Sequence, residues 1–284
     1  MKNLKTELIA CFDRLDTGFH LALLEVQKDC RKGTIHSLRV TMKRLRAFYQ
    51  LLDEIDPHFA GKMAVKKIKP LFTEAGKLRD LQIQQSLVLS HEEKLLIEHK
   101  TSEQLQRAVQ LQLGIFQQFL LEYSMAGVRE GSQHARSHLQ HINLRTLRRG
   151  LRNYFKATFK ELSVLSREGL SSKKGLHELR KTVKKLHYNL VIIDQAIPKR
   201  NLSPQLLHPL ENLQNQLGKW HDYRLAIDEM KNLWEVPQEL RRVLRNEEKL
   251  CLQDIRVSLV QLPPLAERLL LEADNMLSPK PVTC

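Results

Sequence analysis

Apolar residues recur every three or four positions between residues 35 and 55, which is the period of an α-helix. At 100° per residue, one face of this segment collects Leu38, Met42, Leu45, Tyr49 and Leu52. An opposite arc of about 80° collects His36, Arg39, Lys43 and Arg46. The pattern predicts an amphipathic helix that packs through one side and presents a ridge of positive charge on the other.

The same periodicity predicts an all-α protein. In the first half we expect helices near 3–29, 35–55, 58–78, 79–90 and 92–125. In the second half we expect them near 142–166, 174–196, 204–218, 221–232 and 237–261, the last with Pro237 in its first turn. Residues 123–133, "YSMAGVREGSQ", have the weakest pattern and are a candidate link between the halves. The prolines of 262–264 should end a helix before a terminal helix at about 265–277.

The basic helix has a second copy further along the chain. "IHSLRVTMKRLRAFYQLLDEI" (35–55) aligns with "LHELRKTVKKLHYNLVIIDQA" (176–196) at an offset of 141 residues. This alignment matches His36 with His177, Arg39 with Arg180, Lys43 with Lys184, Arg44 with Lys185, and Arg46 with His187. "KPLFTEAGKLRD" (69–80) answers in the same order to "HPLENLQNQLGKWHD" (208–222), so that Arg79 matches His221 and Lys77 matches Lys219. We therefore predict an internal duplication into two helical bundles, residues 1–140 and 141–284.

Positive charge is concentrated in four windows of the chain, 31–48, 62–79, 141–160 and 173–187. The whole protein carries a formal net charge of +14, and these windows hold 24 of its 46 Lys and Arg residues with only Glu74 and Glu178 as carboxylates. The rest of the chain has 22 basic and 30 acidic residues. A solvated surface needs no such separation of sign, so the pattern indicates a polyanionic partner bound at a defined place.

The third window, 141–160, predicts another cationic ridge. Its basic side chains share one arc of about 80° and are Arg145, Arg149, Arg152, Lys156 and Lys160. Residues seven apart on a helix are separated by about 10.5 Å, so such a row could touch successive phosphates of an extended chain. Arginine would add forked hydrogen bonds to phosphate oxygens, and lysine a mobile point charge.

The paired "HxLRxxxKRLR" and "HxLRxxxKKLH" helices and the "GKLRD" and "GKWHD" elements resemble the conserved histidine α-helical domain (CHAD) family. The resemblance runs from about residue 5 to 275. It implies two helical bundles related by a pseudo-two-fold axis, with basic helices of both halves lining a central groove or pore that binds inorganic polyphosphate. It also implies binding without catalysis or cofactor, and an association with polyphosphate granules.

Carried onto this chain, the resemblance places the binding positions on the two motif helices. They are His36, Arg39, Lys43 and Arg46 in the first half and His177, Arg180, Lys184 and His187 in the second. The candidate set is completed by neighbouring basic and histidine positions and by the third ridge, namely Arg44, Arg79, Arg145, Arg149, Arg152, Lys156, Lys185, Lys219 and His221. His187 and His221 exchange a permanent charge of the first half for a titratable one.

Two questions of residue role remain open from the sequence. His36 and His177 either contact phosphate or are partly buried and hydrogen-bonded near their helix starts. Asp80 and Asp222 follow basic or histidine residues, and we expect each to anchor a cationic side chain or cap a helix.

Two other functions compete with polyphosphate binding. The His221-Asp222 pair is a feature of metal-dependent phosphohydrolases, but its counterpart is Arg79-Asp80, and arginine is not a metal ligand. Nucleic-acid binding fits the sequence pI of 9.7. Aromatic residues are only 6% of the chain, however, and do not alternate with the basic ridges as stacking platforms would. We therefore expect non-specific binding in vitro, and a non-specific nucleic-acid-binding protein is the alternative function.

The remaining composition bears on the cellular compartment. The four cysteines are scattered without metal or disulfide spacing, which is typical of a reducing compartment. No secretory segment or membrane-spanning run is evident in the sequence. We expect a cytoplasmic protein; its oligomeric state is not encoded in any pattern that we recognise.

Overall fold

The computed structural model describes residues 4–168, 170, 172–196 and 204–277, and within this part of the chain the protein is all-α. The first half contains α1 (Leu4–Lys28), α2 (Lys32–Ile55), the short 3₁₀ helix η1 (Pro57–Phe59), α3 (Gly61–Leu95), α4 (Lys100–Glu122) and α5 (Ala126–His141). The second half contains α6 (Leu144–Glu168), α7 (Lys173–Ala196), α8 (Pro204–Glu229), α9 (Gln238–Val260) and α10 (Leu262–Leu277). The predicted fold class is confirmed.

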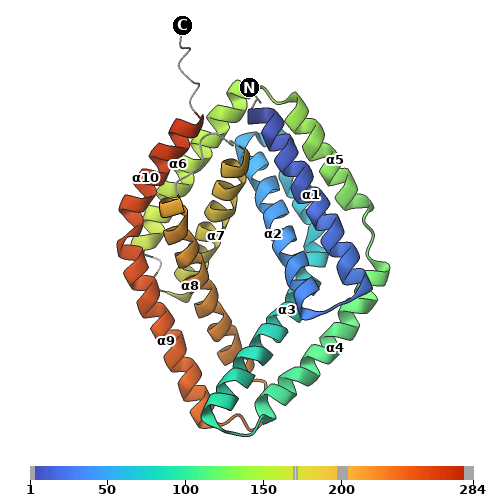
Figure 1. The fold of residues 1–284 in the computed structure, drawn as a ribbon, viewed down its shortest axis with the longest axis vertical. Helices are drawn as coiled ribbons and strands as arrows, with labels where there is room; N and C mark the ends of the chain where they lie inside the picture. The colour runs from blue at the N-terminus through green and yellow to red at the C-terminus, as the bar shows by residue number, and fades with distance from the viewer. Residues whose placement is uncertain (1–3, 169, 171, 197–203, 278–284) are drawn as a thin grey trace.

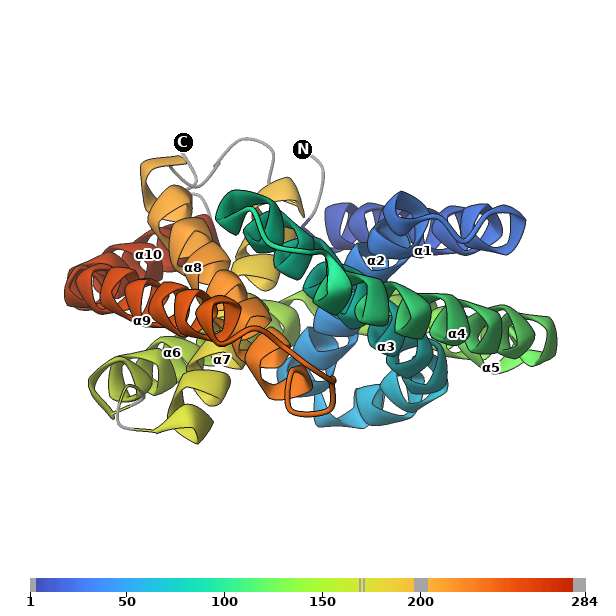
Figure 2. The ribbon, with the colours of Figure 1, turned by 90° about the horizontal axis from the view of Figure 1, so that it is seen from below.

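Helices α2, α3, α7 and α8 lie in the middle of the molecule, as Figure 1 shows. Helices α1, α4 and α5 flank them on one side, and α6, α9 and α10 on the other. Seen from below, α3 extends across toward α8 and α9, and it contacts both (Figure 2). Contacts of α2 with α6 and α7 also join the two halves.

The helices of the two halves pack in the same order. In the first half α1 packs on α2, α2 on α3, and α3 on α4. In the second half α6 packs on α7, α7 on α8, and α8 on α9, and the last helix returns to the first in both, as α5 on α1 and α10 on α6. This parallel supports the internal duplication, which stays a prediction together with its pseudo-two-fold axis.

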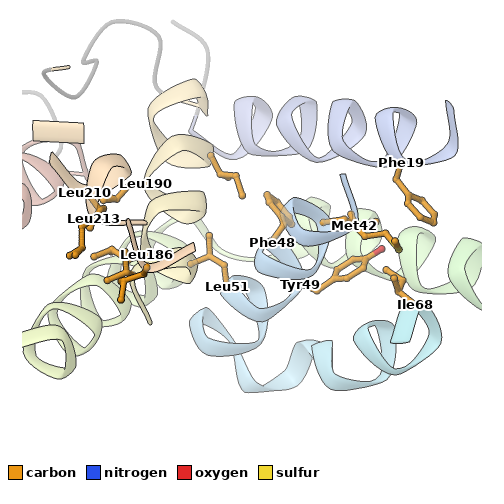
Figure 3. Close-up of a cluster of buried hydrophobic side chains, with 14 of the residues drawn as sticks. Phe19, Met42, Phe48, Tyr49, Leu51, Ile68, Leu186, Leu190, Leu210 and Leu213 are labelled. Atoms are coloured by element: carbon orange, nitrogen blue, oxygen red, sulfur yellow. The ribbon is translucent and has the colours of Figure 1, made fainter. Parts of the chain in front are cut away.

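The buried apolar side chains form one continuous cluster that includes residues of both halves. Figure 3 shows part of it, with Phe48 and Tyr49 of α2 on one side and Leu186 and Leu190 of α7 on the other. At the contact between α6 and α2, a Cβ on Gly150 would lie 2.7 Å from the carbonyl oxygen of Ile55, so this glycine permits the close approach of the two helices. The two halves therefore share a core.

The structure corrects several predicted boundaries. Helices α3 and α8 run through the expected breaks at 78–79 and 218–221, because Gly76 and Gly218 are accommodated inside packed helices. The expected helix at 92–125 is interrupted: Leu96, with a φ of 53°, ends α3 in the left-handed region, and α4 starts at Lys100. No glycine occurs at that turn, so the sequence lacks the residue that usually indicates a helix end of this kind.

The predicted link at 123–133 is also wrong. Most of it belongs to α5, which buries Val128, Ser132, Ala135 and Leu139. The glycines that weakened the helical pattern allow α5 to approach α3 closely, because a Cβ on Gly131 would lie only 3.2 Å from the Cβ of Ala64. Near the end of the chain, the prolines of 262–264 do not precede the last helix. They lie in the first turn of α10, where the missing amide hydrogens cost nothing.

None of the described helices is long and apolar enough to cross a membrane.

Candidate polyanion-binding cavity

Helices α2 and α7 each bury the predicted apolar face and thereby direct their cationic ridges away from the core. Leu38, Met42 and Leu45 of α2 are fully buried, as are their counterparts Leu179, Val183 and Leu186 of α7. This packing follows from the 3.6-residue period of both segments. It turns the basic side chains of two distant parts of the sequence toward a shared space.

That space contains a cavity of 640 Å³ walled by α2, α3, α7 and α8. Eight of the predicted binding residues line it, namely His36, Arg39, Lys43, Arg79, Arg180, Lys184, Lys219 and His221. Asp80 and Asp222 are the acidic residues of its wall. Cationic side chains from both halves therefore meet in one cavity.

A second hollow of 370 Å³ adjoins the first. The two share Lys43, Phe72, Arg180, Lys184 and Tyr188 in their walls. The second hollow adds Arg46 and Lys185 to the predicted residues, together with the acidic residues Glu161 and Glu178. Because the walls are continuous, an extended ligand could contact cations of both hollows at once.

Arg39 is the most firmly held of these cations. It is only 9% exposed, and its Nη1 donates a hydrogen bond of 3.2 Å to the carbonyl oxygen of Phe72 in α3. Its Nη2 lies 3.6 Å from Oδ1 of Asp80. Asp80 therefore anchors a cationic side chain, as the sequence predicted, while the alternative of a helix cap is wrong because Asp80 and Asp222 both lie inside helices.

Phe72 is a residue of the site that the sequence did not single out. The guanidinium of Arg46 lies 4.3 Å from the centre of its ring and that of Arg39 lies 4.9 Å from it. The ring face attracts cations and holds the two guanidinium groups beside each other without neutralising them. A lone phenylalanine in a helix is usually a core residue. The sequence feature that could have indicated a role in the site was the position of Phe72 in the basic window 62–79.

Gly76 creates the space that Arg39 occupies. A Cβ on Gly76 would lie 2.5 Å from Nη1 of Arg39, whereas a Cβ on the corresponding Gly218 of α8 would have no atom within 4 Å. We expect Gly218→Ala to raise the free energy of unfolding by about 0.5–1 kcal/mol, because alanine favours the helix. Gly76→Ala should show no such gain, because the methyl group displaces Arg39 from the Phe72 carbonyl. Chemical denaturation of both variants measures the difference, and equal gains would show that Gly76 has no role in seating Arg39.

Lys43 of α2 and Lys184 of α7 both line the two hollows and therefore lie where these join. Burial is the main cause that lowers the pKa of Lys184 to about 6 and that of Lys43 to about 8, and the positive charges of Arg39 and Arg180 act in the same direction. The two amines therefore titrate as a pair. Without a ligand, this pair carries less than its full charge at neutral pH.

Other titratable groups of the cavity are displaced in the same sense. Burial first, and then Arg180, His177 and Lys184, lower the pKa of His221 to about 4. Partial burial and then the neighbouring charge of Arg79 lower the pKa of His36. Burial raises the pKa of Asp222, with repulsion from Asp80 adding to it and attraction to Arg180 opposing it. Burial is the first cause in all three cases and favours the neutral form, while the neighbouring positive charges lower the pKa of the two histidines further and oppose the rise in the pKa of Asp222.

Some predicted residues lie at the margin of the cavity. His177 is exposed, and its ring centre lies 6.1 Å from that of His221. His36 is exposed as well, which disfavours the alternative that these two histidines are buried for structural reasons. Arg44 is exposed, and burial lowers the pKa of the nearby His187, with the negative charge of Glu211 opposing that change. Lys219 lines the cavity as well, and its Nζ lies 3.9 Å from Oε2 of Glu247, which partly offsets its charge.

The third ridge is not brought to the cavity. Arg145, Arg149 and Lys156 of α6 are exposed and line neither hollow. Arg152 pairs with Asp274 of α10 at 3.2 Å. The burial of Leu147, Leu151 and Tyr154 sets the direction of this ridge, and sequence periodicity could not show which neighbours those residues would meet.

Within the described residues, no group of three or more His, Cys, Asp or Glu side chains is arranged to hold a metal ion.

Comparison with known proteins places these features in a family. Residues 19–231 match the family model described as "CHAD domain". The crystal structure of the CHAD domain from the plant Ricinus communis superposes with a TM-score of 0.64 at 16% sequence identity, covering 91% of this chain and 92% of that one. PptA from Streptomyces chartreusis superposes with a TM-score of 0.60 at 12% identity, covering 94% of this chain and 100% of that one. No curated protein sequence matches this chain.

Proposed function

Because this chain belongs to the CHAD family, we propose that it binds inorganic polyphosphate non-covalently in the cavity between its two helical bundles, without cleaving it. The observation that carries the proposal is the meeting of two cationic ridges, from α2 and α7, in the wall of one 640 Å³ cavity. The resemblance of the paired motifs to the family supplies the ligand class. The proposal includes the predicted duplication, with one ridge contributed by each copy, and an association with polyphosphate granules.

The chemistry of the cavity suits a chain of phosphates. Each internal phosphate carries one negative charge and offers only oxygen acceptors, so the ligand needs a row of donors and no base-reading groups. Arg39, Arg46 and Arg180 provide forked donors, and Lys43 and Lys184 provide compact charges between them. Release of counterions from the polyanion would supply much of the driving force, as it does for DNA.

A nucleic acid is the less favoured polyanion. Single-stranded nucleic acids usually bind by stacking their bases on exposed aromatic rings. Phe72 in the cavity wall is already covered by the guanidinium groups of Arg39 and Arg46. This arrangement positions charge and leaves that ring unavailable to a base.

The test is competition at physiological salt between long-chain polyphosphate and single- or double-stranded DNA, counted per phosphate. We expect polyphosphate to displace the nucleic acid, and its association constant to fall steeply as salt is added. A gel of the recovered polyphosphate, after incubation with Mg²⁺ or Mn²⁺, should show unchanged chain length. Preferential binding of DNA would replace the proposed ligand, a flat salt dependence would contradict the charged contacts, and shortened chains would show catalysis.

A further inference from the structure

Lys43 and Lys184 belong to a cluster of cations that two helices bring together. Arg39, Lys43, Arg180 and Lys184 all line the larger cavity, and like charges gathered in this way disfavour the protonated form of a lysine. The pair lies where the two hollows of the cavity join, in the path of any ligand that spans both. A proton-accepting amine, that of Lys184, therefore lies at the centre of the site.

The surroundings explain why that amine is neutral. Lys184 is faced by Arg39 and Lys43 of α2 and by Arg180 of α7. The acidic side chains that line the same hollows are Asp80 of α3, Glu161 of α6, Asp222 of α8 and, on α7 itself, Glu178, and α8 also contributes His221. Arg46 of α2 and Lys181 and Lys185 of α7 add positive charge to the second hollow. Helix α1 packs on α7 as well, but none of its described residues lines either hollow. The net field at Lys184 is positive, which opposes a further proton.

A phosphate chain would reverse this field. Negative charge within hydrogen-bond reach favours the protonated forms of lysine and histidine. Each amine would then have phosphate oxygens to which its N–H groups can donate. The change in protonation is larger in the second half of the chain, because His221 can gain a proton whereas the corresponding residue of the first half, Arg79, is always charged.

Resting on the proposed function, we infer that the cavity takes up protons together with its polyanion, at the Lys43–Lys184 pair first and at His221 second. Affinity is then governed by pH as well as by salt. The sign follows from linkage: groups that hold more protons in the bound state make binding stronger as pH falls. Between the pKa of about 6 of Lys184 in the free site and its higher value in the complex, uptake of one proton corresponds to about a tenfold gain in affinity per pH unit.

Calorimetry measures this uptake directly. Long-chain polyphosphate is titrated into the protein at pH 7.5 in non-phosphate buffers that differ in ionisation enthalpy. Long chains are used because their internal phosphates keep their charge over this pH range. We expect the binding enthalpy to vary with the buffer, with a slope of about one proton taken up per site. An enthalpy that is the same in every buffer would overturn the inference.

Variants assign the proton to its residue. Lys184→Arg keeps a cation that does not lose its proton, and we expect it to bind with less proton uptake and a shallower pH dependence than the wild type. Lys184→Met removes the titrating group and should also flatten the pH dependence, but at lower affinity. Lys249→Arg, at an exposed position of α9 outside both hollows, is the matched control and should retain the wild-type uptake. If both Lys184 variants take up as many protons on binding as the wild type, Lys184 is not the residue that accepts the proton.

The two proposals fail in different ways. If polyphosphate does not bind in any buffer at pH 6 or pH 7.5, the proposed function is wrong. If it binds at both values with no exchange of protons, the proposed function stands and the coupling to protons is wrong.

Discussion

Replacing Arg39, Lys43, Arg180 and Lys184 together with Ala should lower the affinity for long-chain polyphosphate by about a thousandfold. These four side chains come from both cationic ridges and line the same cavity. If each of the four side chains contributes about 1 kcal/mol, the net value of a typical hydrogen bond in water, their loss amounts to about 4 kcal/mol, and about 1.4 kcal/mol is a factor of ten. The measurement is isothermal titration calorimetry at physiological salt.

The variant must remain folded for this result to count. None of the four residues contributes to the apolar cluster, so circular dichroism should show the helical content of the wild type. Arg39 is the exception that needs a check, because it is buried and bonded to the Phe72 carbonyl. A triple variant that retains Arg39 should still lose most of its affinity. Unchanged affinity in a folded quadruple variant would refute the assignment of the site.

The second large effect concerns the turn between α3 and α4. Glu92 is fully buried, and its carboxylate accepts hydrogen bonds from the backbone amides of Thr101 and Ser102 in the first turn of α4. A carboxylate at a helix start satisfies amides that have no partner within the helix and interacts favourably with the helix dipole. We expect Glu92→Ala to lower the free energy of unfolding by about 2–4 kcal/mol, because it leaves these buried donors unsatisfied.

The neighbouring glutamate provides the control. Glu93 is exposed, and Glu93→Ala should change the free energy of unfolding by no more than about 0.5 kcal/mol. Urea denaturation of the two variants, compared at the midpoint and slope of each curve, measures both values. Equal stability of the two variants would mean that the Glu92 carboxylate does not hold the turn in place.

Periodicity was sufficient to predict the elements that build the cavity. The apolar and basic arcs of 35–55 and 176–196 are local properties of the sequence, and the structure buries one arc of each helix and turns the other toward the cavity. The repeat at an offset of 141 residues also indicated that the two helices would play equivalent parts. The first inference needed only the geometry of a single helix, and the second needed only the alignment of the two segments.

The features that sequence could not supply depend on contacts between helices. The glycines of α5 have the composition of a linker, and only the proximity of α3 explains them as packing positions. The turn at Leu96 is held by Glu92 from the preceding helix, so no local residue signals it. The α6 ridge matches the other ridges in pattern but lies outside the cavity, because the side of a helix that faces a ligand is decided by its packing partners. The sequence predicted that Arg145, Arg149, Arg152 and Lys156 contact the ligand; because they line neither hollow, we expect their contribution to be small.

The central claim is that polyphosphate binding depends on where the charges lie and not on how many there are. Two variants of equal formal net charge test it most directly. The first variant replaces four cavity residues with Ala, namely Arg39, Lys43, Arg180 and Lys184. The second replaces four residues of α6 that line neither hollow with Ala, namely Arg145, Arg149, Lys156 and Lys160. Calorimetric titration of both with the same long-chain polyphosphate, at one salt concentration, should show an affinity lost in the first and within a few fold of the wild type in the second. Equal losses in the two variants would mean that net charge alone attracts the polyanion, which would contradict the account.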